Sequence, residues 1–118
     1  MEYMFLIYYD ENSLSEAELA QCYAESAEYA RELHASGKRV LAAPLHPTLT
    51  ATSLRNREGK RMITDGPFAE TREQLGGLFL VDAKNLDEAI EIADKIPAGR
   101  WGTIEIRPVL EVPGLPKS

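Results

Sequence analysis

Residues 3–9 have the sequence YMFLIYY, which is rich in aromatic side chains and predicts a first β-strand. Successive side chains of a strand point to opposite faces, so Phe5 and Ile7 would share one face and Met4 and Leu6 the other. Both faces are therefore apolar. An antiparallel sheet with one face in water alternates between apolar and polar residues instead. The sequence thus predicts that both faces of this strand are covered.

A long helix is expected next. Two capping boxes, Ser13 with Glu16 and Ser15 with Glu18, could each mark its start. Apolar residues then recur at helical spacing up to about residue 36, at Leu19, Tyr23, Ala27, Ala30 and Leu33. This stripe would face the core, and its alanines would let the helix lie close to a sheet. Gly37 is the expected residue that ends the helix.

The rest of the chain predicts more strands and a second helix. Strands are expected at residues 39–45, 48–55, 61–64, 77–82 and 103–110. The helix begins at Asn85, an N-cap with Glu88 three residues later, and ends before Pro97. Strands 48–55 and 61–64 form a hairpin around Glu58-Gly59. Without this inserted hairpin the order is βαββαβ, the skeleton of the ferredoxin-like α+β fold, with an antiparallel sheet and both helices on one face.

The second face of the sheet needs its own cover. Residues 78–81, LFLV, are apolar on both sides, as residues 3–9 are. Since the helices cover only one face, a second copy of the chain across a two-fold axis is the simplest cover for the other. The sequence therefore predicts a homodimer.

Composition excludes several other classes of protein. The 118 residues are enough for one domain, and the net charge of −6 argues against direct nucleic-acid binding, which depends on Lys and Arg. The basic residues around Glu58-Gly59 are expected to be a solvated hairpin tip. No apolar run approaches the ~20 residues of a membrane span, so no membrane association is expected. The single Cys22 cannot form an internal disulfide, which favours the cytoplasm. No metal or cofactor motif is visible.

Residues 64–77, TDGPFAETREQLGG, leave a strand, turn at Gly66-Pro67 and enter another strand after a glycine pair. The glycine pair allows close approach of backbone or ligand. This stretch resembles the signature of the DGPF family, a branch of the YCII-related proteins. Further similar segments are PLHPT (44–48), ATSLR (51–55), LDEA (86–89) and EIRPV (105–109).

The resemblance implies a YCII-related/DGPF domain at residues 1–112 followed by a tail at 113–118. It also implies a dimeric α+β barrel, in which two ferredoxin-like sheets pack face to face. Two functions follow from it. Some YCII-related proteins resemble small enzymes with a His–Asp pair in a cleft, which implies small-molecule binding and simple acid/base catalysis such as elimination or isomerisation. DGPF proteins are often associated with extracytoplasmic-function sigma factors, which implies a non-catalytic regulatory module. The sequence leaves open whether the chain is an enzyme.

The resemblance also suggests site residues. Asp65 belongs to the matched motif, and His46 lies in a segment where it could face Asp65, so these two are the candidate catalytic residues. A carboxylate beside a histidine stabilises the imidazolium form and makes a credible acid/base pair. The candidate substrate-binding residues are Arg55, Gly66, Pro67 and Phe68. Two structural interpretations stay open. Asp65 could cap the turn by accepting a hydrogen bond from the backbone N–H two residues on, and His46 could be an ordinary loop residue.

Overall fold

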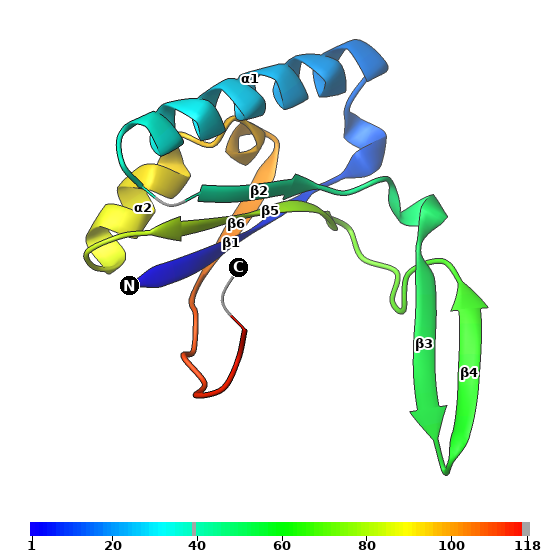
Figure 1. The fold of residues 1–118 in the computed structure, drawn as a ribbon. Coiled ribbons are helices and arrows are strands. Elements are labelled where there is room, and N and C mark those ends of the chain that lie inside the picture. The colour runs from blue at the N-terminus through cyan, green and yellow to red at the C-terminus, as the bar shows by residue number, and fades with distance from the viewer. Residues whose placement is uncertain (39, 117–118) are drawn as a thin grey trace.

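The computed structural model describes residues 1–38 and 40–116 as two layers, a four-stranded antiparallel sheet and a layer of helices (Figure 1). The strand order is β2-β5-β1-β6. The strands are β1 (Glu2–Tyr9), β2 (Val40–Pro44), β5 (Gln74–Asp82) and β6 (Gly102–Pro108). The predicted α+β class with antiparallel sheets is confirmed, and this strand order is consistent with a ferredoxin-like arrangement.

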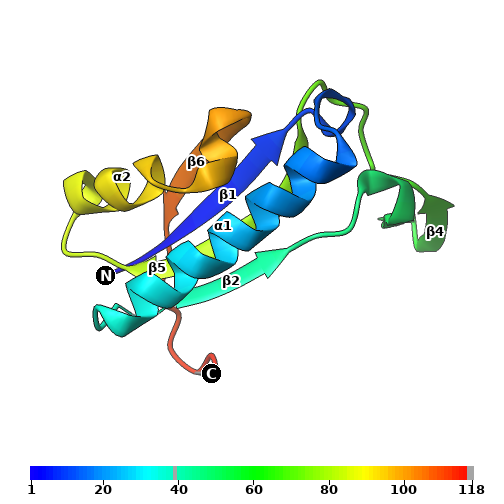
Figure 2. The ribbon, with the colours of Figure 1, turned by 90° about the horizontal axis from the view of Figure 1, so that it is seen from above.

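Both α-helices of the described residues lie on the same face of the sheet (Figures 1 and 2). They are α1 (Glu16–Ala35) and α2 (Leu86–Asp94). Of the two predicted capping boxes, the one between Ser15 and Glu18 forms, with N–H to side-chain distances of 3.0 and 3.1 Å. Asn85 caps α2 by accepting a hydrogen bond from the Glu88 N–H at 2.9 Å. Side chains therefore satisfy free N–H groups at both helix starts, as the sequence predicted.

The core lies between the helices and the sheet. Alternate residues of β1 and β5 form its sheet side, and Phe5 and Val81 are completely buried. Cys22 and Leu33 of α1 pack against them. Tyr29, also on α1, donates a hydrogen bond from its hydroxyl to the carbonyl oxygen of Ile92 at 2.7 Å. This bond joins the two helices above the sheet.

The glycine pair at the start of β5 stands where a side chain would clash. A Cβ on Gly76 would lie 2.7 Å from Cζ and 2.8 Å from the hydroxyl oxygen of Tyr9. A Cβ on Gly77 would lie 3.1 Å from the carbonyl oxygen of Ala43 on the neighbouring strand. The predicted close approach is confirmed, since Gly76 lies against an aromatic ring and Gly77 against backbone.

The inserted hairpin projects away from the main sheet (Figure 1). Its strands, β3 (Thr52–Arg57) and β4 (Lys60–Asp65), form a separate two-stranded sheet. Glu58 and Gly59 connect them with φ angles of 50° and 78°, the left-handed backbone of a tight two-residue hairpin turn. The predicted hairpin tip is therefore confirmed.

The segment that leads into the hairpin differs from the prediction. A strand was expected from residue 48, but Thr48–Thr50 form a short 3₁₀ helix, η2. The Glu11 carboxylate accepts hydrogen bonds from both the N–H and the hydroxyl of Thr48, each at 2.9 Å. This contact spans 37 residues of sequence, so the local pattern gave no sign of it.

The chain exposes much more surface than a compact monomer does. Its accessible surface is 8738 Å², whereas a compact monomer of 13.1 kDa exposes about 6,400 Å². Its radius of gyration is 16.1 Å, against roughly 13.5 Å for a globular chain of this length. The projecting hairpin and one open face of the sheet produce this excess. Neither helix in the described part of the chain has the length and apolar character needed to cross a membrane.

Candidate functional site

The Asp-Gly-Pro-Phe turn follows β4 and folds back onto β3. Asp65 is the last residue of β4, where it pairs with Thr52, and it is exposed. The Gly66 N–H donates to the carbonyl oxygen of Ala51 at 2.7 Å, and the Ser53 hydroxyl donates to the carbonyl oxygen of Gly66 at 2.8 Å. Gly66 has a φ of 94°, which favours glycine over any other residue. These contacts fix the backbone of the turn.

The proposed cap by Asp65 fails for a chemical reason. The residue two positions after Asp65 is Pro67, which has no N–H to donate. Ser53 and Ala51 hold the turn instead. The structure therefore leaves the Asp65 carboxylate without this structural role.

Arg55 is the site residue that the structure brings to the turn. Its Nη2 donates to the carbonyl oxygen of Phe68 at 3.3 Å. The Phe68 side chain is 78% exposed, and Pro67 is exposed as well. The exposed turn thus carries a carboxylate and an aromatic ring, and Arg55 reaches it from β3, where strand register puts its side chain on the face of the hairpin opposite to that of Asp65.

His46 lies on a different segment, between β2 and η2, and is exposed. The preceding residue, Leu45, donates its N–H to the carbonyl oxygen of Gly76 at 2.9 Å, which ties this segment to the start of β5. Within residues 1–38 and 40–116, no hydrogen bond or ion pair joins His46 to Asp65. The structure gathers Arg55, Gly66 and Phe68 but does not join the two candidate catalytic residues.

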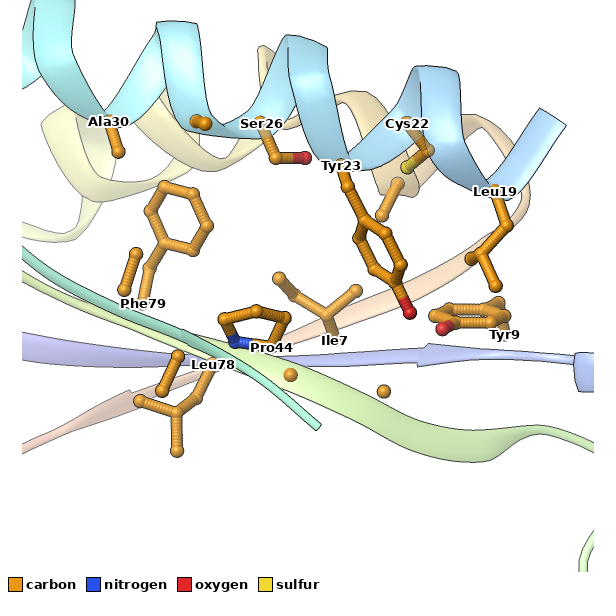
Figure 3. A pocket seen from close by; sticks show the side chains of 16 residues that line it. Ile7, Tyr9, Leu19, Cys22, Tyr23, Ser26, Ala30, Pro44, Leu78 and Phe79 are labelled. Atoms are coloured by element: carbon orange, nitrogen blue, oxygen red, sulfur yellow. The ribbon is translucent and has the colours of Figure 1, made fainter. Parts of the chain in front are cut away.

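A pocket that the sequence did not predict lies between α1 and the sheet (Figure 3). Its volume is about 320 Å³, and it is partly open to solvent. Small residues form much of its wall, namely Ala27, Ala30, Ala42, Ala43, Gly76 and Gly77. The alanine stripe of α1 was expected to pack closely on the sheet. The stripe packs against the core at Leu19, Ala30 and Leu33. It does not do so at Tyr23, which is 39% exposed, or at Ala27, which is also exposed, and the pocket lies beneath these two.

Four side chains bring hydroxyl or thiol groups to this pocket, those of Tyr9, Cys22, Tyr23 and Ser26 (Figure 3). Burial, together with side-chain hydrogen bonding with Tyr23, raises the pKa of Tyr9 well above its usual range. Burial also raises the pKa of the Cys22 thiol. Both groups are therefore protonated near neutral pH, and the thiol is a poor nucleophile.

A second pocket, of about 230 Å³, lies between α2 and β6 and is lined by Ile90, Ala93, Asp94, Gly99, Ile104 and Ile106. Neither this pocket nor the first includes a candidate residue of the turn or His46. No group of three or more His, Cys, Asp or Glu side chains in the described residues could hold a metal ion.

Comparisons with known proteins agree with the resemblance noted in the sequence. The sequence model of the YCII-related domain matches residues 1–113. A protein of Rhizobium meliloti (strain 1021), described as uncharacterised, is 37% identical, and the match covers 92% of each chain. The match to the family extends through both helices, the sheet and the hairpin. The chain belongs to the YCII-related family.

Proposed function

We propose that this chain is a member of the DGPF branch that forms a homodimer of the α+β barrel type and binds a small molecule beside the Asp-Gly-Pro-Phe turn. The observation that carries the proposal is the apolar surface that one chain leaves exposed. This surface has two parts, the open face of the sheet and the projecting hairpin.

The open face of the sheet is apolar over β2, β5 and β1. Strand register places Leu41, Leu80 and Met4 side by side in one row, and Ala43, Leu78 and Leu6 in the next. Each of these side chains faces away from the helices. Leu41 is 57% exposed, at the edge of the sheet. Toward β6 the same face becomes charged, with Arg107 beside Met4 and Glu105 beside Leu6. An apolar strip with a charged border is typical of a protein interface.

The hairpin and the turn expose apolar side chains as well. Leu54 and Ile63 are opposite each other in the ladder, so they share a face of the hairpin, and they are 59% and 58% exposed. Leu49, just before the hairpin, is 91% exposed, and Phe68 is 78% exposed. Exposed apolar side chains gathered on a projecting arm are typical of a surface that another protein chain covers.

The exposed area is sufficient for a stable dimer. The 8738 Å² of the chain exceeds the expectation for a compact monomer by about 2,300 Å², whereas a standard interface buries about 800 Å² of each partner. A second copy brings its own apolar strip and its own arm, so a two-fold arrangement covers both at once. We therefore favour a second copy over an unrelated partner.

The dimer would also complete the ligand site. In one chain, Asp65 and Phe68 lie on the exposed turn and Arg55 reaches it from β3, with no opposing wall, and His46 stands apart from them. A second copy against the hairpin would supply that wall. In such a cleft, His46 would accept a proton from the substrate, Asp65 would stabilise the imidazolium, and Arg55 would bind an acidic group of the substrate. The fitting substrate class is a small polar or aromatic acid.

A thermal-shift screen with a library of small acids tests this site. Acids that raise the melting temperature of the wild type should lose their effect in Asp65→Asn and Arg55→Ala. They should still raise the melting temperature of Asp87→Asn, which removes another exposed carboxylate, at the start of α2. Acids that stabilise all four proteins equally would show that binding occurs away from the turn.

The alternative is a regulatory module that uses the same arm to bind another protein, such as a sigma factor. The exposed side chains Leu49, Leu54 and Phe68 would suit that role too. A pull-down of the purified protein with the products of its neighbouring genes distinguishes the two. Saturable binding that Leu54→Asp abolishes and Asp65→Asn leaves unchanged favours the regulatory module.

A further inference from the structure

The pocket between α1 and the sheet has the form of a binding site rather than of a loosely packed core. Protein interiors are filled to the density of organic crystals, and a core position beside a void normally carries a larger side chain. Here the facing positions are Ala27 and Ala30 on α1, Ala42 on β2, and Gly76 on β5. Small residues on three separate elements keep about 320 Å³ free, which is within the usual range of small-molecule sites.

The pocket opens beside the edge strand β2. Ala42 points to the helix side, as its partner Phe79 does, but it is exposed because α1 does not cover it. Tyr23 and Ala27 on α1 are exposed across from it. A small molecule can therefore enter between α1 and β2 without any strand or helix moving.

The walls are apolar and uncharged, with hydrogen-bonding groups at one end. None of the described residues that line the pocket carries a charge at neutral pH. The hydroxyl groups of Tyr9 and Tyr23 approach each other at this end, while the hydroxyl of Ser26 lies higher in the pocket, beside α1 (Figure 3). An ionised ligand would lose its hydration here without gaining an opposite charge, whereas a neutral ligand with a hydroxyl or carbonyl group would find partners.

The tyrosine at this end is held in place before any ligand arrives. The ring of Tyr9 lies directly against Gly76, where even a methyl group would clash with it, and the side chain is 6% exposed. A hydrogen-bonding group that is already fixed loses little conformational entropy on binding. This arrangement is typical of a specific site.

We propose that this pocket binds a neutral aromatic molecule of about two fused rings that carries one hydroxyl or carbonyl group, oriented by Tyr9 and Tyr23. Size supports the two rings, because an apolar cavity of about 150 Å³ holds a benzene molecule and this one has about twice that volume. The walls come from one chain and include none of the turn residues, so binding here is independent of the dimer and of the site at Asp65.

Calorimetric titration near neutral pH with 2-naphthol, naphthalene and 2-naphthoate tests the proposal. The wild type should bind one 2-naphthol per chain, and 2-naphthoate at least about tenfold more weakly, because its charge has no partner in the pocket. Tyr23→Phe should weaken 2-naphthol by roughly three- to tenfold, the effect of one hydrogen bond, and leave naphthalene unchanged. Tyr8→Phe, which removes a hydroxyl from the opposite face of the sheet, should change neither.

Filling the pocket gives the decisive comparison. Ala27→Leu should weaken 2-naphthol at least about tenfold, since overpacking of this size costs more than one hydrogen bond. Ala24→Leu makes the same substitution at an exposed position of α1 outside the pocket, and should bind as the wild type does. If Ala27→Leu loses its helical circular dichroism, Ala42→Leu on β2 replaces it. Absence of saturable binding to the folded wild type, or equal affinity in the filled and control variants, would overturn the proposal.

Discussion

Substituting Gly76 by alanine is a direct test of how β5 and β1 pack beneath α1. The new Cβ would lie 2.7 Å from Cζ of Tyr9 and 2.8 Å from its hydroxyl oxygen, with Cε1 closer still. Carbon atoms in proteins essentially never approach so closely, so the ring must move. Tyr9 is only 6% exposed, and its ring cannot turn away without losing contacts with the core.

The expected loss of stability follows from two opposing effects. Overpacking a buried position typically costs about 1–3 kcal/mol. Replacing glycine by alanine restricts the unfolded chain, which returns about 0.4–1 kcal/mol. The net destabilisation should be about 1–2 kcal/mol, which lowers the melting temperature of a chain of this length by about 4–8 °C. Chemical denaturation followed by circular dichroism measures the free-energy change.

A double-mutant cycle identifies the cause. In a Tyr9→Leu background the clash is gone, so Gly76→Ala should be neutral or stabilising, with a coupling energy of about 1 kcal/mol or more. Gly102→Ala is the matched control, because its Cβ would clash with backbone atoms of Tyr8 and Tyr9. Shortening the side chain of Tyr9 does not relieve that clash. It should destabilise both backgrounds equally. Equal costs of Gly76→Ala with and without the tyrosine ring would refute the reasoning.

Three other predictions concern the core, a helix cap and alkaline pH. Phe5→Ala removes a completely buried ring and should lower the free energy of unfolding, measured with denaturant, by about 3–5 kcal/mol. A loss as small as that of a surface substitution would place Phe5 outside the core. Ser15→Ala removes the capping box of α1 and should cost about 1 kcal/mol, whereas Ser13→Ala should cost less. Burial raises the pKa of Tyr9 above the value near 10 that it has in the unfolded chain. Below about pH 10 the phenol is neutral in both states, and the folded protein has its full stability. As the pH rises above about 10, the unfolded chain loses the proton more readily than the folded one, and the stability falls. The melting temperature of Tyr9→Phe should fall less steeply than that of the wild type between about pH 9 and pH 11.

Local signals in the sequence were enough to predict most of the elements. Ser15 with Glu18 and Asn85 with Glu88 cap the helices because each pair lies within one turn of backbone. The hairpin tip at Glu58-Gly59 is equally local. The β-rich pattern of residues 3–9 predicted a strand, and β1 is one, paired with both β5 and β6.

The features that sequence patterns missed depend on distant residues. Glu11, between β1 and α1, binds Thr48 and sets the 3₁₀ turn there, so no pattern near Thr48 could reveal it. The pocket depends on the height and rotation of α1 above the sheet, which the spacing of Ala27 and Ala30 does not determine. Alanines at helical spacing suit close packing and a cavity equally well, and only the neighbouring strand decides between them.

The same limit applies to the candidate site. The motif identified Asp65, Gly66, Pro67 and Phe68 as a unit, and the structure shows Arg55 bonded to that unit. Within the described residues the structure shows no bond between His46 and Asp65. We propose that a second chain completes the cleft. In our proposal, the site therefore depends on the formation of the dimer.

Sedimentation equilibrium at micromolar concentration tests assembly most directly. We predict a mass twice the 13.1 kDa of the chain. Leu6→Glu places a charge in the middle of the open face, next to Leu78, and should give a monomer or an aggregate. Ala20→Glu, on the exposed side of α1, should remain a dimer. A wild-type protein that stays monomeric at high concentration would contradict the account, because its open face and hairpin would then be stable in water without a partner.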